Sequence, residues 1–161
     1  MPQFYMLVGA PGSGKSTWTR NFLSKTSDEY VVISSDDIIV EWGKLLDPNM
    51  TYSDAFKKVD YKAVQKELND RLAAAIADMK NIIWDQTNLS SKSRKGRVSR
   101  IPKVYRKTCV VFKLENDELF KRLEKRAQEE GKHIPKKVVT DMLATFEEPV
   151  KSEGFDQIIY V

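Results

Sequence analysis

Short apolar runs recur along the chain and alternate with segments whose apolar residues follow helical spacing. Runs rich in β-branched and aromatic residues predict five strands, at Phe4–Val8, Tyr30–Ser34, Asn81–Trp84, Thr108–Leu114 and Gln157–Val161. Strands buried on both faces are continuously apolar, and strands that alternate with helices form parallel sheets. The pattern therefore predicts an α/β fold, with a five-stranded parallel sheet flanked by helices.

The segments between these strands carry apolar residues at three-, four- and five-residue steps. They predict helices at Lys15–Ser24, Ser53–Met79, Asn116–Glu130 and Lys136–Phe146. Gly131 and Pro135 break the helical pattern between the last two segments. A length of 161 residues suits one globular domain, and we expect residues 1–161 to form it.

Composition excludes several classes of protein. Hydrophobic residues make up 41% of the chain, which is typical of a folded domain. The single cysteine, Cys109, has no intramolecular disulfide partner, and the first residues lack a signal-peptide pattern, so we expect a cytoplasmic protein. No apolar run reaches the roughly 18 residues that span a bilayer, so we expect no membrane association.

Charge is unevenly distributed although the net charge is only +4. The segment from Gln86 to Leu114 contains no acidic residue, and its basic residues are Lys92, Arg94, Lys95, Arg97, Arg100, Lys103, Arg106, Lys107 and Lys113. A basic segment of this kind is a candidate surface for a polyanion. A solvated basic helix face is the alternative.

The segment "GAPGSGKST" fits the pattern G-x-x-x-x-G-K-[ST], with a predicted strand before it and a helix after it. In such a loop, backbone N–H groups surround phosphate oxygens, Lys15 reaches the β- and γ-phosphates, and the Ser16 hydroxyl binds Mg²⁺. We therefore expect ATP or another NTP with Mg²⁺, Ser16 being the metal ligand. The nucleotide-binding residues are Gly9, Ala10, Pro11, Gly12, Ser13, Gly14, Lys15, Ser16 and Thr17.

The rest of the chain favours transfer of the terminal phosphate over GTPase switching. The D-x-x-G and N-K-x-D motifs of switch GTPases are absent. A kinase needs a carboxylate that orients and deprotonates the acceptor hydroxyl. "SSDD" places Asp36 and Asp37 at the carboxyl edge of the sheet, and "DQTN" places Asp85, Thr87 and Asn88 there, where α/β folds bind ligands.

Two of these assignments have alternatives. Ser35 or Asp36 would serve equally as the N-cap of a helix that runs from Asp37 toward Trp42. Asp85 suits the Mg²⁺ side of the site as well as the acceptor side, and the sequence does not separate the two roles.

An arginine-bearing helix precedes a polar loop, and together they predict a lid over residues 116–135. Arg122 and Arg126 are four residues apart and share one helix face, so both are candidates for binding the transferring phosphate. The alternative is a solvated helix in which these arginines pair with Glu118 and Glu130. His133, in the loop, is expected to be solvated.

Five segments in order resemble the kinase module of phage and bacterial polynucleotide 5′-kinases: "GAPGSGKSTW", "SSDD", "DQTNLSSKSR", "KRLEKRAQEEGKHIP" and "EEPVKSEGFDQIIYV". The resemblance covers nearly the whole chain. It implies an adenylate-kinase-like P-loop NTPase fold and transfer of the ATP γ-phosphate to the 5′-hydroxyl of DNA or RNA. It further implies that Asp36 is the general base, that Arg126 is the lid arginine, and that Lys15 and Ser16 act on the phosphates and the metal.

Two positions depart from some members of that family. Ile39 stands where they have an arginine three positions after the base, and Gln86 separates Asp85 from Thr87. Both departures concern acceptor recognition. No D-x-D-G-T phosphatase signature occurs, so a separate ligase or phosphatase is a possible partner.

The resemblance implies a role for the basic segment between Gln86 and Leu114. Ser90 or Ser91 is a candidate N-cap for a helix that carries Arg94 and Arg97 beside Asn88, where they would contact acceptor phosphates. The expected acceptor site thus comprises Asp36, Asp85, Thr87, Asn88 and Arg94, and the expected partner is nucleic acid with a 5′-hydroxyl end. The alternatives are a kinase of a small hydroxylated metabolite (a sugar, nucleoside or amino sugar) and a non-catalytic ATP-binding module.

Overall fold

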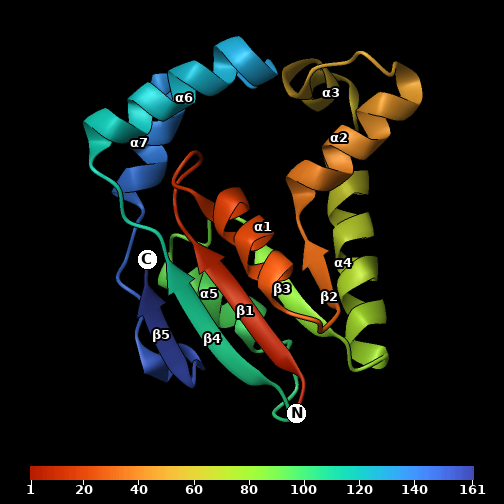
Figure 1. Cartoon of the computed structure of the whole chain (residues 1–161), viewed down its shortest axis with the longest axis vertical. Coiled ribbons are helices and arrows are strands. Elements are labelled where there is room, and N and C mark those ends of the chain that lie inside the picture. The colour runs from red at the N-terminus through yellow and green to blue at the C-terminus, as the bar shows by residue number, and fades with distance from the viewer.

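A computed structural model describes all 161 residues and contains one sheet of five parallel strands (Figure 1). The strand order is β2-β3-β1-β4-β5. The predicted α/β fold and five-stranded parallel sheet are confirmed, and the predicted strands differ only by a few residues at their ends. The strands are β1 Gln3–Val8, β2 Tyr30–Ile33, β3 Asn81–Asp85, β4 Arg106–Val111 and β5 Gln157–Tyr160.

Helices flank both faces of the sheet and extend beyond its carboxyl edge. In Figure 1, α1 crosses the front of the sheet, α5 lies behind it, and α6 and α7 stand above its upper edge opposite α2 and α3. The helices are α1 Lys15–Lys25, α2 Ser35–Leu46, α3 Tyr52–Lys58, α4 Tyr61–Ala77, α5 Ser91–Val98, α6 Asn116–Glu130 and α7 Lys136–Ala144, and a 3₁₀ turn spans Lys151–Glu153.

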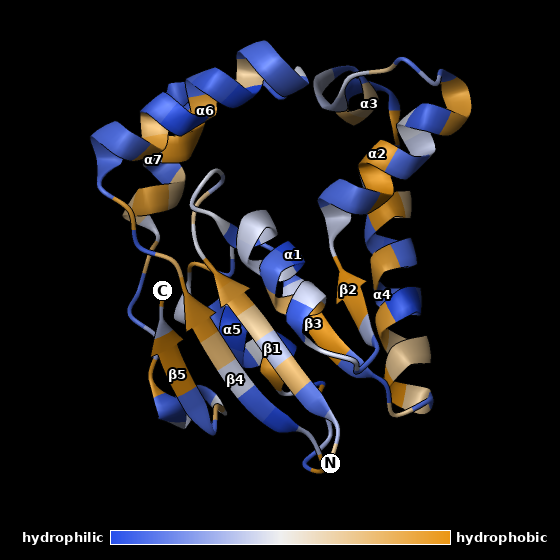
Figure 2. Ribbon diagram, viewed as in Figure 1, coloured by the Kyte–Doolittle hydropathy of each residue, from blue (hydrophilic) through white to orange (hydrophobic).

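The central strands β1, β3 and β4 are largely buried, which explains their apolar runs, whereas the edge strands β2 and β5 are only partly buried (Figure 2). Successive side chains of a strand point to opposite faces. Phe4 and Met6 of β1 therefore join the main core, to which α4 and α5 contribute, whereas Leu7 joins a smaller cluster packed against Trp18 and Phe22 of α1.

One predicted helix is wrong in its extent. The segment Ser53–Met79 forms two helices, α3 and α4, instead of one. Val59 is extended, with φ −82° and ψ 148°, and the side chain of Asp60 accepts a hydrogen bond from the N–H of Lys62 and caps α4. Because aspartate is a strong N-cap, a new helix begins here. The break lets α3 turn away from α4 toward α6.

A third apolar cluster anchors α6 and α7 to the loop after β1. Leu119 and Leu123 of α6 pack with Val139 of α7 and with Ala10 of that loop. The segment predicted as a lid therefore shares a small core of its own with the phosphate-binding loop. Helix length and hydropathy together leave no helix suited to crossing a membrane.

Candidate active site

The loop between β1 and α1 has the backbone conformation that the sequence motif requires. Gly14 is the N-cap of α1 and adopts φ 106°, which is unfavourable for any residue with a Cβ atom. The N–H of Gly9 donates to the carbonyl of Thr87 at 3.0 Å, which ties the loop to the end of β3. The loop is thereby held at the carboxyl edge of the sheet.

Several polar groups of this loop have no partner within the protein and fit a phosphate. Gly12, Gly14, Lys15, Ser16 and Thr17 donate no backbone hydrogen bond through their N–H groups. The Ser13 hydroxyl is buried and also lacks a partner. Buried polar groups are normally hydrogen-bonded, and N–H groups that converge at a helix N-terminus bind anions. The loop is therefore suited to a polyphosphate, and the exposed Ser16 hydroxyl to its Mg²⁺.

The Lys15 ammonium lies inside this loop. Its Nζ donates to the carbonyls of Gly9 at 2.7 Å and Ala10 at 3.0 Å. Burial lowers the pKa of Lys15 to about 8, with Lys132 and Arg126 acting in the same direction against the carboxylates of Asp85 and Asp36. Lys15 therefore stands between two carboxylates and two cations, one of which belongs to the loop after α6.

The carboxyl groups of Asp36, Asp37 and Asp85 lie near one another at this edge, and those of Asp36 and Asp85 also lie near Lys15; desolvation is the largest influence on the pKa of each. Burial raises the pKa of Asp85, against the charge of Lys15, and the like charges of Asp37 and Asp36 raise it further. Burial and the neighbouring carboxylates also raise the pKa of Asp37. Clustered carboxyl groups with perturbed pKa values are a feature of catalytic sites.

Asp36 differs from its two neighbours because it has direct partners. Its Oδ1 accepts a hydrogen bond from the Tyr52 hydroxyl at 2.8 Å, and its Oδ2 pairs with Lys132 Nζ at 2.7 Å. Burial opposes ionisation, but Lys132, Tyr52 and Lys15 outweigh it and leave the pKa of Asp36 below its ordinary value. Burial and the Asp36 charge raise the pKa of Tyr52, so its hydroxyl stays protonated and donates.

The capping alternative for Asp36 is wrong. Ser34 caps α2: its hydroxyl accepts from the N–H of Asp37 at 3.3 Å. Asp36 lies in the first turn, where the carboxylate is favoured by the positive end of the helix dipole. Its side chain is thus directed to Tyr52 and Lys132 and takes no part in the cap.

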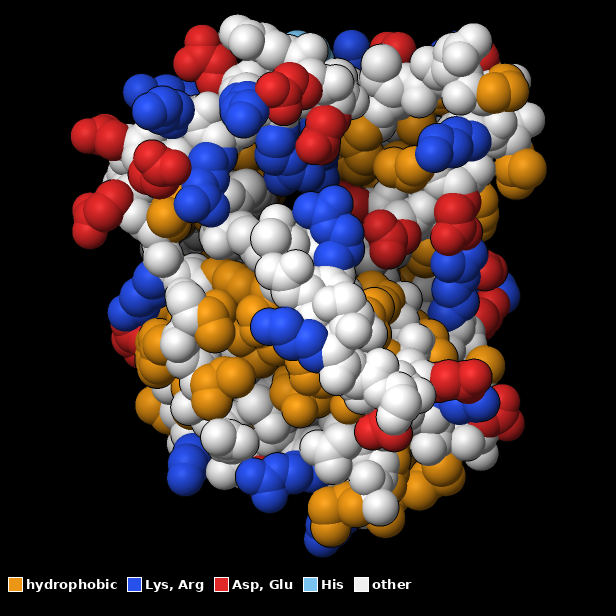
Figure 3. Space-filling view, in the orientation of Figure 1, with side chains coloured by type: hydrophobic (Ala, Val, Ile, Leu, Met, Phe, Trp, Pro, Cys, Tyr) orange, Lys and Arg blue, Asp and Glu red, His pale blue; other side chains and the backbone are white.

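The two lid arginines lie over the phosphate-binding loop and also make the ion pairs of the alternative interpretation. Arg122 pairs with Glu118 at 3.1 Å and Arg126 with Glu130 at 3.5 Å. A Cβ atom on Gly14 would lie 3.9 Å from the Arg122 guanidinium. In Figure 3, acidic and basic side chains gather in the hollow between α6 and α2, above α1.

The α6–α7 loop is docked on α3 through Gly131. This residue ends α6 with φ 66°, and a Cβ atom there would come within 2.8 Å of Thr51 Cγ2. We expect Gly131→Ala to lower the free energy of unfolding by about 1–2 kcal/mol, because alanine is strained in the left-handed region. Urea denaturation measures the change.

Gly96 is the matched control for this substitution. It lies within α5, and a Cβ atom there would meet nothing within 4 Å. Gly96→Ala should stabilise the protein by about 0.5–1 kcal/mol, because alanine loses less backbone entropy in a helix. Equal effects of the two substitutions would contradict the strained, tightly packed conformation of Gly131.

Gln86 joins β3 to α2. Its amide oxygen accepts from the Trp84 indole at 2.8 Å, and its amide nitrogen donates to the Ser35 hydroxyl at 3.2 Å. The residue that departs from part of the family pattern is therefore a structural link. Next to it, Thr87 contributes its carbonyl to the N–H of Gly9, and its side chain is half-buried.

The structure corrects the assignment of Asn88 and Arg94 to the acceptor site. Asn88 is buried, donates to the carbonyls of Leu7 at 2.8 Å and Gln86 at 3.3 Å, and accepts from Arg97. Both ends of its amide are therefore occupied by protein groups. It holds the loop after β3 against β1.

Arg94 is fully buried and its guanidinium has only protein partners. It forms two hydrogen bonds with Glu153 at 2.9 Å and donates to three backbone carbonyls, those of Asn88, Leu89 and Glu147. All of these N–H groups donate to acceptors within the protein. Arg94 therefore holds the C-terminal segment against α5 and does not face a ligand. Ser90 caps α5 through the N–H of Ser93, as predicted.

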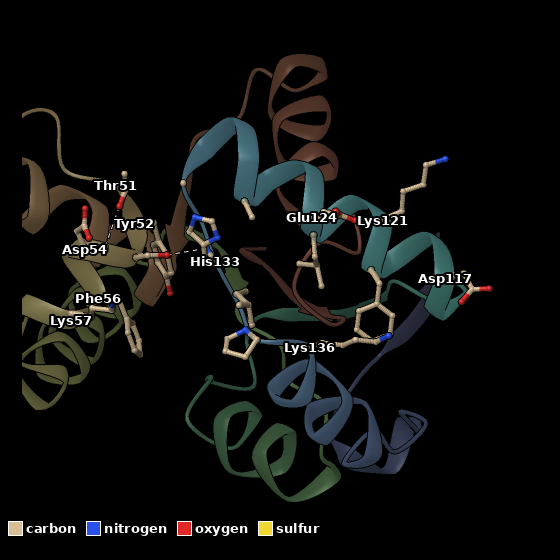
Figure 4. A pocket seen from close by; sticks show the side chains of 17 residues that line it. Thr51, Tyr52, Asp54, Phe56, Lys57, Asp117, Lys121, Glu124, His133 and Lys136 are labelled. Carbon is tan, nitrogen blue, oxygen red and sulfur yellow. Dashed lines mark hydrogen bonds between the residues drawn. The ribbon is translucent and has the colours of Figure 1, made fainter.

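A groove of about 1240 Å³ opens between α3 and the α6–α7 segment (Figure 4). In Figure 4, Tyr52 and Phe56 lie on one side, Lys121 and Lys136 on the other, and His133 between them. Further lining residues include Lys57, Phe120, Ile134 and Pro135. Tyr52 belongs both to this groove and to the hydrogen bond with Asp36, so the groove borders the candidate base.

The comparison with protein families identifies the family of this chain. A family model described as an AAA domain matches residues 4–149. The chain belongs to the AAA domain family. A chain in the structure of the Pnkp1/Rnl/Hen1 RNA repair complex is 31% identical to this AAA domain with a TM-score of 0.68, over 89% of this chain and 43% of that chain. The predicted resemblance to polynucleotide kinases is thus confirmed.

Other relatives of this AAA domain carry different names. An unliganded sugar kinase from Janibacter sp. HTCC2649 has a TM-score of 0.62 at 19% identity, over 100% of this chain and 85% of that chain, which shows a shared fold. Human heterogeneous nuclear ribonucleoprotein U-like protein 2 is 26% identical over 158 residues, 96% of this chain. This chain spans only 21% of the length of that relative. The neighbours support a phosphotransferase with a P-loop kinase fold.

Sequence reasoning missed two residues of the site in this AAA domain, Tyr52 and Lys132. Tyr52 belongs to no motif. Lys132 lies in the segment "KRLEKRAQEEGKHIP", which gave it no role, and is 96 positions from Asp36. The only local signal was the position of Lys132 directly after Gly131, in the loop predicted to close over the site.

Proposed function

We propose that this chain is an ATP-dependent polynucleotide 5′-hydroxyl kinase. The observation that carries the proposal is the place of Asp36, between the Lys15 loop and a groove with aromatic and cationic walls. A carboxylate in that position borders both a site suited to the γ-phosphate and a site suited to an acceptor. The non-catalytic alternative leaves the groove and this carboxylate without a use.

The residues divide into donor-side and acceptor-side roles. The Ser16 hydroxyl would hold Mg²⁺, which when bound would supply positive charge to the β- and γ-phosphates. Lys15 and the lid arginines Arg122 and Arg126 stabilise the charge on the transferring group. Asp36 accepts a hydrogen bond from the acceptor hydroxyl, orients its oxygen toward phosphorus and takes its proton. The carboxylate of Asp85, at the end of β3, favours the protonated form of Lys15.

We also propose that residues 1–161 act as a single kinase domain in which residues 116–135 form the lid. The small apolar cluster under α6 and the contact of Gly131 with Thr51 hold the lid on the site. With the lid in this position water is excluded from the transferring phosphate, which limits hydrolysis.

A nucleic-acid acceptor is favoured by the walls of the groove. Stacking of bases on aromatic rings, together with lysines along the phosphates, is the usual way that single strands are bound. Tyr52 and Phe56 offer the rings, and Lys57 and Lys136 offer the charges. The relative in the RNA repair complex is in keeping with this acceptor, and with a ligase partner.

A transfer assay with a panel of acceptors tests the proposal. We expect labelled phosphate from ATP to reach a 5′-hydroxyl oligonucleotide, and not the same oligonucleotide with a 5′-phosphate. Transfer at low acceptor concentration should fall as salt rises, because binding a polyanion releases counterions. Preferred transfer to a sugar or free nucleoside, without salt dependence, would replace this proposal by a metabolite kinase. ATP hydrolysis without any acceptor would also reject it.

A further inference from the structure

Lys132 is the one lid residue that contacts the candidate base directly. Its side chain is only 12% exposed, and its Nζ lies 2.7 Å from Asp36 Oδ2. The same ammonium lies 4.4 Å from the centre of the Tyr52 ring, whose hydroxyl binds the other oxygen of Asp36. Lys132, Tyr52 and Asp36 therefore form a closed cluster contributed by the lid loop, α3 and α2.

This contact depends on the position of the lid loop. The loop is attached to α3 next to Lys132 on both sides: Gly131 lies against Thr51, and the N–H of His133 donates to the Ser53 hydroxyl at 2.8 Å. If the loop left α3, the Lys132 ammonium would leave Asp36 with it. The ion pair therefore forms only when the lid is closed.

Other charged and titratable groups face Asp36 from the elements around it. They are Lys132 of the lid loop, Tyr52 of α3, Lys15 of α1, Asp37 of α2 and Asp85 of β3. Lys132 and Lys15 are cations, but only Lys132 forms an ion pair with the carboxylate of Asp36. Removal of Lys132 would leave Asp36 beside two carboxyl groups with Lys15 as the remaining cation.

We propose that Lys132 is a positioning residue that couples closure of the lid to the ionised, correctly oriented state of Asp36. The proposal rests on the proposed function, because it assigns to Asp36 the role of base. A positioning role fits Lys132 better than a structural one, since the side chain of Asp36 is 48% exposed and an ion pair with an exposed partner contributes little net stability.

The coupling also accounts for opening of the lid after phosphate transfer. The acceptor oxygen forms a bond to the γ-phosphorus while the bond from that phosphorus to the β,γ-bridging oxygen breaks, with ADP as the leaving group. The acceptor proton passes to Asp36, whose neutral carboxyl group no longer balances the charge of Lys132. The ion pair is lost, the lid is released, and Asp36 returns its proton to solvent.

The test compares Lys132→Met, which removes the charge at similar length, with Lys132→Arg, which keeps it. Lys137→Met is the control, because Lys137 follows in the same segment but is exposed and pairs only with Asp141. Two quantities are measured for each: the pH dependence of kcat/KM for phosphate transfer, and the pKa of the Asp36 carboxyl by carbon-13 NMR.

Lys132→Met should lower kcat/KM at neutral pH about tenfold or more, because Asp36 loses the contact that orients it. It should also move the acid limb of the profile upward by about one pH unit or more, because a cation at this distance lowers a carboxyl pKa by that amount. The NMR pKa of Asp36 should rise by the same shift. Lys132→Arg should restore most of the activity and the low pKa, and Lys137→Met should match the wild type.

The outcomes separate this inference from the function on which it rests. Wild-type transfer with an unmoved acid limb and an unmoved Asp36 pKa in Lys132→Met would overturn the role of Lys132 and leave the kinase standing. A loss of activity without either shift would mean a structural role and would overturn it too. Absence of transfer by the wild-type protein would overturn both proposals.

Discussion

Asp36→Asn is expected to lower phosphate transfer to a 5′-hydroxyl oligonucleotide by about 10²- to 10⁴-fold, the usual contribution of a general base. Asparagine keeps the size of the side chain but accepts no proton from the acceptor. ATP binding should be nearly unchanged, because the groups suited to the phosphates belong to the Lys15 loop. Single-turnover transfer and calorimetric ATP binding measure the two effects separately.

The control for this substitution is Asp70→Asn, on the exposed face of α4, where Asp70 pairs with Lys66. It should transfer phosphate at the wild-type rate. Near-normal transfer by Asp36→Asn would reject Asp36 as the base. A large loss in Asp37→Asn with retention in Asp36→Asn would move the role to the neighbouring carboxyl group.

Arg94→Met is expected to lower the free energy of unfolding by about 3–5 kcal/mol, the cost of breaking a buried ion pair by removing one partner. The side chains of Arg94 and Glu153 are 0% and 1% exposed, so Glu153 would remain as a buried charge without its cation. Three backbone carbonyls would also lose the hydrogen bond that Arg94 donates to them. Urea denaturation measures the change.

Arg71→Met is the matched control, because Arg71 also binds carboxylates, those of Glu41 and Glu67, but at the surface. It should cost less than about 1 kcal/mol, as surface ion pairs do. A similar, small loss in both variants would contradict a structural role for Arg94. Loss of acceptor binding in a fully stable Arg94→Met protein would return Arg94 to the acceptor site.

The pH dependence of stability gives a second measure of the Arg94–Glu153 pair. Burial alone would raise the pKa of Glu153, but the hydrogen bonds and charge of Arg94 outweigh it and hold that pKa below its ordinary value. The pair therefore stabilises the fold above the unfolded pKa of about 4.3, and this contribution is lost as pH falls through the folded pKa. The acid-dependent loss should be smaller in Arg94→Met.

Much of the fold was predictable because its signals are local. Strands buried on both faces must be apolar throughout, and the glycine-rich loop requires a strand before it and a helix after it, so their order indicated a parallel sheet. The single long helix was wrong because apolar periodicity continues from α3 into α4. Only the cap at Asp60 marks the break, and aspartate at that position is compatible with a helix interior as well.

The site was predictable to the extent that its residues belong to motifs. Lys15 and Ser16 follow from the loop, and Asp36 and Asp85 follow from the ends of neighbouring strands, because parallel strands end at the same edge. Asn88 was assigned to the acceptor because it follows β3 at the carboxyl edge of the sheet, and Arg94 because the family resemblance suggested a phosphate-binding role for the basic segment. Neither residue type reveals whether its polar atoms face solvent or the interior.

The amino-acid sequence by itself determined the sheet, the phosphate loop and the carboxylates at its edge, because each depends on residues that are near one another in the chain. Only the tertiary structure decided which charges meet. The C-terminal segment places Glu153 against Arg94, and both side chains are buried in an ion pair. Lys132 of the lid loop forms an ion pair with Asp36 of α2. Such pairings depend on how distant elements pack, and a charge acquires its role from the partner and the solvent exposure that this packing leaves it.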